Sequence, residues 1–150
     1  MRLLIQRVSE ASITIDGTQT AAIGQGLLVL IGVEENDTQE DILYLVPKLI
    51  GLRIFSDQEG KMNLNLQQVQ GQILLVSQFT LHASTKKGNR PSFIKAAKPE
   101  HAKNLYEQLI CEMATQHGQA PQTGSFGADM KIALVNDGPV TIFMDSKMRE

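Results

Sequence analysis

Apolar and polar positions in the first 33 residues alternate or cluster in the way that β-strands require. In 11–16 apolar residues alternate with polar ones, which predicts a strand with one face in solvent. In 27–31 every residue is apolar, which predicts a strand covered on both faces. Asp16-Gly17 predicts a hairpin turn. We therefore expect four strands between turn-forming residues, over 2–8, 11–16, 20–24 and 26–33.

The segment that follows predicts an amphipathic helix. Asp37 is a suitable N-cap residue, and Glu40 completes a pattern similar to a capping box. Apolar residues then recur at helical spacing as far as Gly51, where we expect the helix to end. Pro47 lies inside this stretch and removes one backbone hydrogen bond, so we expect a kink or an early stop there.

The remainder of the chain predicts further strands around a second helix. That helix begins at Pro99, whose fixed φ suits a first turn, and ends at about Gly118. The segment 82–98 before it is polar and basic without periodicity, and loops of this length are usually functional or disordered. Strands with two helices are typical of an α+β fold. We expect the additional strands over 53–56, 73–81, 130–136 and 140–144, the last two joined through Asp137-Gly138-Pro139.

Composition predicts the number of domains and the compartment. A chain of 150 residues that is 42% hydrophobic can bury one core, so we expect a single domain over 1–150 with a frayed tail at 145–150. Cys111 is the only cysteine, which excludes an internal disulfide framework. No segment has the pattern of a secretory signal, and the apolar run 27–31 is far shorter than a membrane-spanning helix. We expect a cytoplasmic protein with no membrane role.

The formal net charge of −2 conceals two segments of opposite charge. In 34–59 seven acidic residues accompany Lys48 and Arg53, a balance of −5. In 86–103 six basic residues accompany Glu100, a balance of +5. Salt screens distant charges, so a local basic surface can attract phosphate groups whatever the total charge is. The alternative interpretation is a solvated lysine-rich loop.

Conventional catalytic groups are few in this sequence. Cys111 lies in the predicted second helix beside acidic residues, which disfavour a reactive thiolate. Ser77 and Thr80 have no evident base of the kind that activates a hydroxyl, and on the residues alone they are ordinary strand residues. The histidines lack the paired spacing of a metal site, so we predict no metal: His82, His101 and His117.

Two short segments nevertheless resemble the signature motifs of a known family, the D-aminoacyl-tRNA deacylase (D-tyrosyl-tRNA deacylase) family. Its motif S-Q-F-T-L matches Ser77-Gln78-Phe79-Thr80-Leu81, and its motif N-x-G-P-V-T matches Asn136-Asp137-Gly138-Pro139-Val140-Thr141. The resemblance extends from Met1 to about Met144. It refines the fold class to a layered α/β/β single domain with mixed, largely antiparallel sheets. It also implies a homodimer with active sites at the subunit interface and without a cofactor.

The resemblance implies a chiral filter at Gly138-Pro139. On the residues alone a trans bond is expected, since few X-Pro bonds in folded proteins are cis. In the family this bond is cis, and the loop enters the active site of the partner subunit with two carbonyl oxygens near the substrate Cα. An L side chain would clash there, whereas a D side chain would point outward and glycine would pass. The implied substrates are D-aminoacyl-tRNA and glycyl-tRNA.

The resemblance also implies a way to cleave the ester. Its catalytic segment consists of Ser77, Gln78, Phe79 and Thr80, in which the backbone N–H near Phe79 and the Ser77 hydroxyl polarise the carbonyl. The 2'-OH of the terminal ribose would move the proton, so that the tRNA supplies the group that the protein lacks. Thr80 as a nucleophile is the mechanistic alternative.

Further residues are implied to shape the site. Phe126, Met130 and Arg90 would surround the terminal adenosine. Ordinary core packing is the alternative for Phe126 and Met130, and for Met130 the two are equally expected. Arg7 would steady the Gly138-Pro139 loop across the interface. A catalytically silent RNA-binding module that uses 86–103, and a conventional Ser/Thr esterase, are the alternative functions.

Overall fold

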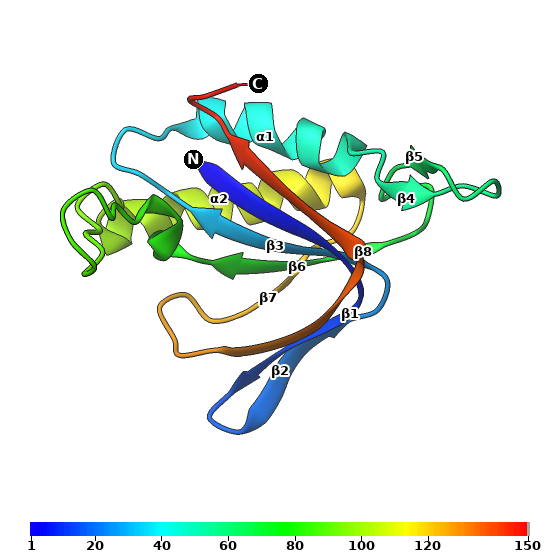
Figure 1. The fold of residues 1–150 in the computed structure, drawn as a ribbon, viewed down its shortest axis with the longest axis horizontal. Coiled ribbons are helices and arrows are strands. Elements are labelled where there is room, and N and C mark those ends of the chain that lie inside the picture. Colours follow the sequence, from blue (N-terminus) through cyan, green and yellow to red (C-terminus); the bar gives the residue numbers. More distant parts are fainter. Residues whose placement is uncertain (150) are drawn as a thin grey trace.

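Six strands form one mixed β-sheet in the computed structural model, which describes residues 1–149 (Figure 1). β1 is antiparallel to β2, β3 and β8, whereas β6 is parallel to β3 and β7. The predicted α/β class with mixed pairing is confirmed. The strands are β1 (Arg2–Ile15), β2 (Thr18–Ile23), β3 (Gly26–Gly32), β6 (Gln72–Ser77), β7 (Gln122–Thr123) and β8 (Lys131–Asp145).

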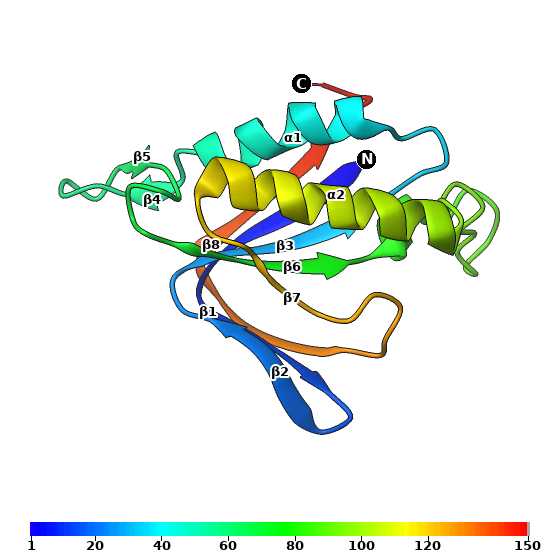
Figure 2. The ribbon, with the colours of Figure 1, turned by 180° about the vertical axis from the view of Figure 1, so that it is seen from behind.

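Two helices, α1 (Gln39–Gly51) and α2 (Pro99–His117), lie side by side on one face of the sheet (Figure 2). α1 continues past Pro47, so the expected early stop does not occur. α2 ends where predicted, because Gly118 adopts a left-handed conformation at its C-terminus. None of the helices in residues 1–149 is long and apolar enough to cross a membrane.

The N-cap of α1 differs from the prediction. Thr38 caps the helix, and its hydroxyl accepts a hydrogen bond from the Glu40 N–H at 3.3 Å. The carboxylate of Asp41, not of Glu40, completes the capping box by accepting from the Thr38 N–H at 2.8 Å. Asp37 is instead buried, and its carboxylate lies 2.5 Å from the α-ammonium group of Met1. Because its carboxylate is engaged in this ion pair, Asp37 does not cap the helix.

β1 and β8 are each one long strand where the sequence predicts two. They pair with each other along most of their length, with register shifts between Gln6 and Val8 and between Val8 and Glu10. The polar residues in the middle of each strand therefore form irregularities in a continuous strand and do not form turns. Figure 1 shows that the sheet curves along β1 and β8, so that β2 lies away from the helices.

The curved sheet separates two apolar cores. Side chains of β3 alternate between them: Leu27 and Val29 belong to the core beneath the helices, whereas Leu28 belongs to the second core with Leu74 of β6. This alternation confirms the prediction that 27–31 is covered on both faces.

Smaller elements also differ from the expectations. A hairpin of β4 (Phe55–Ser56) and β5 (Met62–Leu64) replaces the single strand predicted over 53–56, and neither β5 nor β7 was predicted. The segment expected to be a loop over 82–98 is one from residue 83 onward, and an isolated β-bridge joins Ser84 to Ser92. β4, β5 and β7 are two or three residues long, which is too short for a periodic pattern in the sequence.

The prediction of a frayed tail at 145–150 is wrong for residues 145–147. Asp145 ends β8 and accepts a hydrogen bond from Arg2, and Ser146 is buried with its hydroxyl 2.9 Å from the Met1 nitrogen. Lys147 pairs with Asp41 at 2.9 Å. Glu150 lies outside the described residues.

Candidate active site

β6 ends at Ser77, and the chain turns there into a short 3₁₀ helix, η1 (Phe79–His82). The strand predicted over 73–81 is therefore four residues too long. The last sheet-like contact is made by the Gln78 N–H, which donates to the Ile31 carbonyl at 2.6 Å. Phe79 and Thr80 open the turn, so their N–H groups have no acceptor inside it. The first motif thus combines a strand end with backbone donors.

A pocket of about 760 Å³ lies beside this strand end. Its volume is typical of small-molecule sites. Ser77, Gln78 and Phe79 line one side of it, and Phe126 and Met130 line another. The structure therefore brings five of the predicted site residues together. Phe126 and Met130 also pack against the two cores, as the core interpretation expects, and their contact with adenosine stays a prediction.

Aromatic rings form the walls of the pocket. The Phe79 ring is 57% exposed and makes an edge-to-face contact with Phe93, with ring centroids 5.0 Å apart. Tyr106 of α2 lies 5.8 Å from Phe126. Phe93 comes from the polar and basic segment 82–98, so this segment contributes directly to the pocket. Tyr106 was not singled out from the sequence, because it falls on the apolar face of α2 like any core residue.

Tyr106 does not supply acid–base chemistry to the pocket. Its hydroxyl donates a hydrogen bond to the Leu75 carbonyl at 3.0 Å. Burial raises the pKa of Tyr106 to about 12. The phenol therefore remains protonated and serves as a rigid wall.

Thr80 belongs to the first motif but not to the pocket lining. Its hydroxyl accepts a hydrogen bond from the Gln78 side-chain amide at 2.5 Å. An amide N–H is not a base and cannot take the proton of a nucleophilic hydroxyl. The geometry divides the predicted catalytic segment into three lining residues and one supporting residue.

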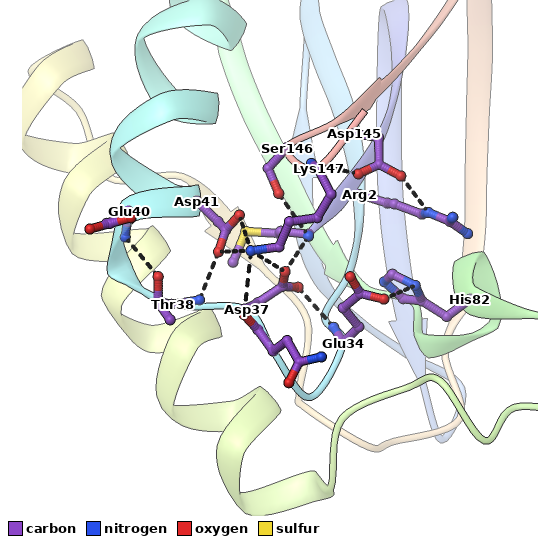
Figure 3. Close-up of polar contacts among 12 residues, drawn as sticks. Arg2, Glu34, Asp37, Thr38, Glu40, Asp41, His82, Asp145, Ser146 and Lys147 are labelled. Atoms are coloured by element: carbon purple, nitrogen blue, oxygen red, sulfur yellow. Dashed lines mark hydrogen bonds and ion pairs between the residues drawn. The ribbon is translucent and has the colours of Figure 1, made fainter. Parts of the chain in front are cut away.

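Contacts beneath η1 fix the turn (Figure 3). Arg2 donates to the Leu81 carbonyl at 2.9 Å and to the Asp145 carboxylate at 2.9 Å. His82 is 1% exposed, and its Nδ1 lies 3.9 Å from Glu34. Gly32, at the end of β3, has no room for a side chain, because an added Cβ would lie 2.9 Å from His82 and from Leu81. Sequence reasoning missed Arg2 and Gly32, and only the charge of Arg2 beside an apolar strand was a signal.

The network extends to the N-terminus of α1 (Figure 3). Burial alone would raise the pKa of Asp41, but its hydrogen bonds with Ser146, Lys147 and the Thr38 N–H outweigh burial and hold the pKa at about 2. The carboxylate is therefore ionised at neutral pH and links α1 to the residues after β8.

The second motif is an irregularity in β8. The Gly138-Pro139 bond is cis, which is the form implied by the resemblance and not the form expected from the residues alone. Gly138 has φ +132°, a backbone conformation that residues with a side chain rarely adopt. Arg7 donates to the Asp137 carbonyl at 2.9 Å, and the Asn136 side chain accepts from the Val140 N–H at 2.9 Å. Arg7 thus holds the loop of its own chain, whereas we expected a contact across an interface.

The structure does not bring the two motifs together within one chain. Gly138 and Pro139 are not among the residues that line the pocket, whereas Met130 and Ile132 at the start of the same strand are. At ~3.3 Å per residue, the loop lies roughly 20 Å further along the strand than Ile132. Arg90 is also outside the pocket lining.

The histidines and Cys111 lie elsewhere. His101 Nε2 is 3.1 Å from the Asp37 carbonyl oxygen, and His117 Nε2 is 3.0 Å from the Gly71 carbonyl oxygen, so both make structural contacts. Cys111 is exposed on α2. Among residues 1–149, no three His, Cys, Asp or Glu side chains gather in a way that could hold a metal ion.

The family model for D-Tyr-tRNA(Tyr) deacylase matches residues 4–145. The chain belongs to this family. A D-aminoacyl-tRNA deacylase of Flavobacterium johnsoniae is 60% identical over 150 residues, which cover 100% of both chains. One of Akkermansia muciniphila is 58% identical, again over 100% of both chains. The prediction that this deacylase-family chain is an enzyme, a hydrolase, is confirmed.

Two solved structures share the fold of this chain. A c-Myc DNA unwinding element binding protein superposes with a TM-score of 0.92 at 39% identity, covering 97% of this chain and 98% of that one. A probable eukaryotic D-amino acid tRNA deacylase superposes with a TM-score of 0.80 over 95% of this chain and 97% of that one. Its identity of 18% supports the fold alone.

Proposed function

We propose that the protein hydrolyses the ester between a D-amino acid and the 3'-terminal adenosine of tRNA. The names and high identity of the deacylase relatives support this substrate. The observation that carries the proposal is the pocket at the end of β6, where Ser77, Gln78 and Phe79 lie beside backbone N–H groups that have no acceptor inside the turn. A cytoplasmic location follows from the substrate.

The Phe79 N–H and the Ser77 hydroxyl stabilise the negative charge that develops on the ester carbonyl oxygen. Water attacks the carbonyl carbon, the bond to the ribose oxygen breaks, and the ribose oxygen takes up a proton. The neighbouring 2'-OH of the substrate relays that proton, since no protein base lies beside these groups in the described contacts. The hydrogen bond from Gln78 to Thr80 favours this mechanism over Thr80 as a nucleophile.

The adenine lies between Phe126 and Met130, both of which line the pocket. Stacking of a base on an aromatic side chain contributes about 1–3 kcal/mol. Because the ring of Phe126 also contacts Tyr106, its orientation is restricted before substrate binds. A restricted ring loses less conformational freedom on binding.

We propose further that a second copy of the chain completes the site. Leu134, Val135 and Phe143 of β8 are exposed apolar residues, and β8 pairs within residues 1–149 with β1 alone. An exposed apolar edge strand favours association. In a homodimer, Gly138 and Pro139 of one subunit reach the pocket of the other and exclude L side chains. Glycine has no side chain to exclude, so glycyl-tRNA is also a substrate.

The substrate proposal is tested by incubating the purified protein with D-tyrosyl-tRNA and with the ethyl ester of D-tyrosine. We expect rapid release of tyrosine from the tRNA and little from the ethyl ester, which lacks adenosine and the 2'-OH. Binding of the tRNA without hydrolysis would identify a silent RNA-binding module. Equal rates on both compounds would identify a conventional esterase.

The mechanism is tested with two variants of the first motif. Thr80→Ala is expected to retain activity within about tenfold, whereas Ser77→Ala is expected to lose about 10²–10³-fold, as removal of an oxyanion donor does. Loss of several orders of magnitude in a folded Thr80→Ala protein would contradict the substrate-assisted mechanism and favour Thr80 as the nucleophile.

A further inference from the structure

The basic loop, residues 84–98, contains positive charges without an acidic partner. No ion pair in residues 1–149 involves them, whereas most other basic side chains of the chain pair with a carboxylate. The sequence contains no acidic residue between Gly60 and Pro99, and the Glu35 carboxylate contacts the end of the loop through the backbone N–H of Lys98 at 3.1 Å, not through a basic side chain. The five basic residues are Lys86, Lys87, Arg90, Lys95 and Lys98.

The basic loop lies beside the mouth of the pocket. Phe93 and Lys98 of the loop line the pocket, and Lys86, Lys87 and Arg90 lie exposed near its tip. Backbone hydrogen bonds of 2.8 and 2.9 Å between Ser84 and Ser92 close the loop. The base of the tip is therefore fixed next to Phe93, which lines the pocket, while the charged side chains of the tip face solvent.

The two ends of the molecule differ in charge. Figure 1 shows the basic loop at one end and the β4–β5 hairpin at the opposite end, where Asp57, Glu59 and Lys61 leave a net charge of −1 and Glu59 pairs with Lys61. A polyanion would be attracted to the end that contains the pocket and not to the hairpin end. The arrangement favours one orientation of a nucleic acid, which a net charge of −2 alone would not predict.

We propose that the basic loop binds backbone phosphates of the tRNA acceptor stem while the 3'-terminal adenosine occupies the pocket. The proposal rests on the proposed function, because the adenosine end must enter beside Phe79. The ribose-phosphate chain then leaves the pocket past Phe93, next to the unpaired cations. Arg90, which lies outside the pocket lining, belongs with the lysines on this phosphate-binding surface.

A comparison of two substrates tests the proposal. D-tyrosyl-tRNA carries the phosphate chain, whereas 2'(3')-O-D-tyrosyl-adenosine keeps the ester, the 2'-OH and the adenine without any phosphate. The test variant is Lys86→Gln/Lys87→Gln. The matched control is Lys48→Gln/Lys61→Gln, which removes the same charge from exposed positions outside the basic loop.

We expect the test variant to lose about tenfold in kcat/KM on D-tyrosyl-tRNA and nothing on D-tyrosyl-adenosine. The slope of log kcat/KM against log salt concentration should become shallower by about 1.5, since each phosphate contact contributes about 0.7–0.9. The control variant should match the wild type on both substrates.

Three outcomes would overturn the assignment of the basic loop. An equal loss on both substrates would show that the loop only shapes the pocket. No loss on tRNA would show that the charges are merely solvated. The same loss in the control variant would show that only total charge matters. A wild-type protein inactive on both substrates would instead contradict the proposed function itself.

Discussion

Gly32 lies near the pocket and has no room for a side chain. Its Cα faces η1, and an added Cβ would lie 2.9 Å from Leu81 and from His82, closer than side chains normally approach. The neighbouring His82 is fully packed, so it cannot move away without shifting the turn. The backbone donors of the first motif therefore depend on a glycine in a different strand.

Gly32→Ala is expected to lower kcat on D-tyrosyl-tRNA by about tenfold or more, because a misplacement of about 1 Å can cost about a hundredfold in rate. Gly51→Ala is the matched control, since a Cβ there meets nothing within 4 Å. The measurements are steady-state rates and thermal unfolding of both variants. Unchanged kcat in Gly32→Ala would show that the turn adapts freely.

Residue identities could be predicted near the pocket only where a motif marks them. Ser77 and Phe79 were found because they stand in a recognisable string, and both line the pocket. Gly32 and Arg2 carry no such mark, since their importance comes from what η1 packs against. Thr80 has the chemistry of a nucleophile in the sequence, and only the structure shows that its hydroxyl contacts the Gln78 amide, which is not a base.

Among the elements, α1 and the residues after β8 depend on each other through Asp41. The pKa of its carboxylate lies at about 2 in the folded protein, below the ordinary value of 3.8. Because folding lowers this pKa, the ionised carboxylate stabilises the folded state. The stabilisation is complete above about pH 4 and is lost as the pH falls through about 2. It amounts to about 2 kcal/mol at neutral pH.

Asp41→Asn is therefore expected to lower the free energy of unfolding by about 2 kcal/mol near pH 7, and the difference from the wild type should shrink between about pH 4 and about pH 2. Urea unfolding across this range measures it. Glu40→Gln, in the same helical turn, is the control, because its side chain makes none of these contacts. A difference that stays constant with pH would contradict the role of the ionised carboxylate.

Elements with a long periodic pattern were predictable, and short or irregular ones were not. α2 begins and ends close to the predicted positions, because Pro99 and Gly118 mark both ends. β1 and β8 were each divided in the prediction, since their polar midpoints look like turns until the partner strand is known. The prediction extended β6 through the first motif to residue 81, although the chain turns away after Ser77.

For the whole molecule, the separation of the two motifs is the main constraint. Three residues of the first motif line the pocket, whereas Gly138-Pro139 lies outside it, which is why we propose that a second copy of the chain completes the site. In this proposal the exposed apolar residues of β8 are the surface that the second copy covers.

Val135→Glu places a charge on this surface, where the wild-type side chain is 49% exposed. We expect a monomer in sedimentation velocity and loss of discrimination between D- and L-tyrosyl-tRNA. Leu43→Glu on α1, where the wild-type side chain is 50% exposed, is the control and should remain dimeric and selective. A wild-type protein that sediments as a monomer would contradict the shared site.

The central claim is that this pocket cleaves aminoacyl-tRNA and admits only esters without an L side chain. The most direct measurement is the deacylation rate of wild-type protein on D-tyrosyl-, L-tyrosyl- and glycyl-tRNA, each at the same enzyme concentration. We predict rapid hydrolysis of D-tyrosyl-tRNA, measurable hydrolysis of glycyl-tRNA, and a rate on L-tyrosyl-tRNA equal to that of the uncatalysed reaction. Equal rates on the D- and L-tyrosyl esters would contradict the account.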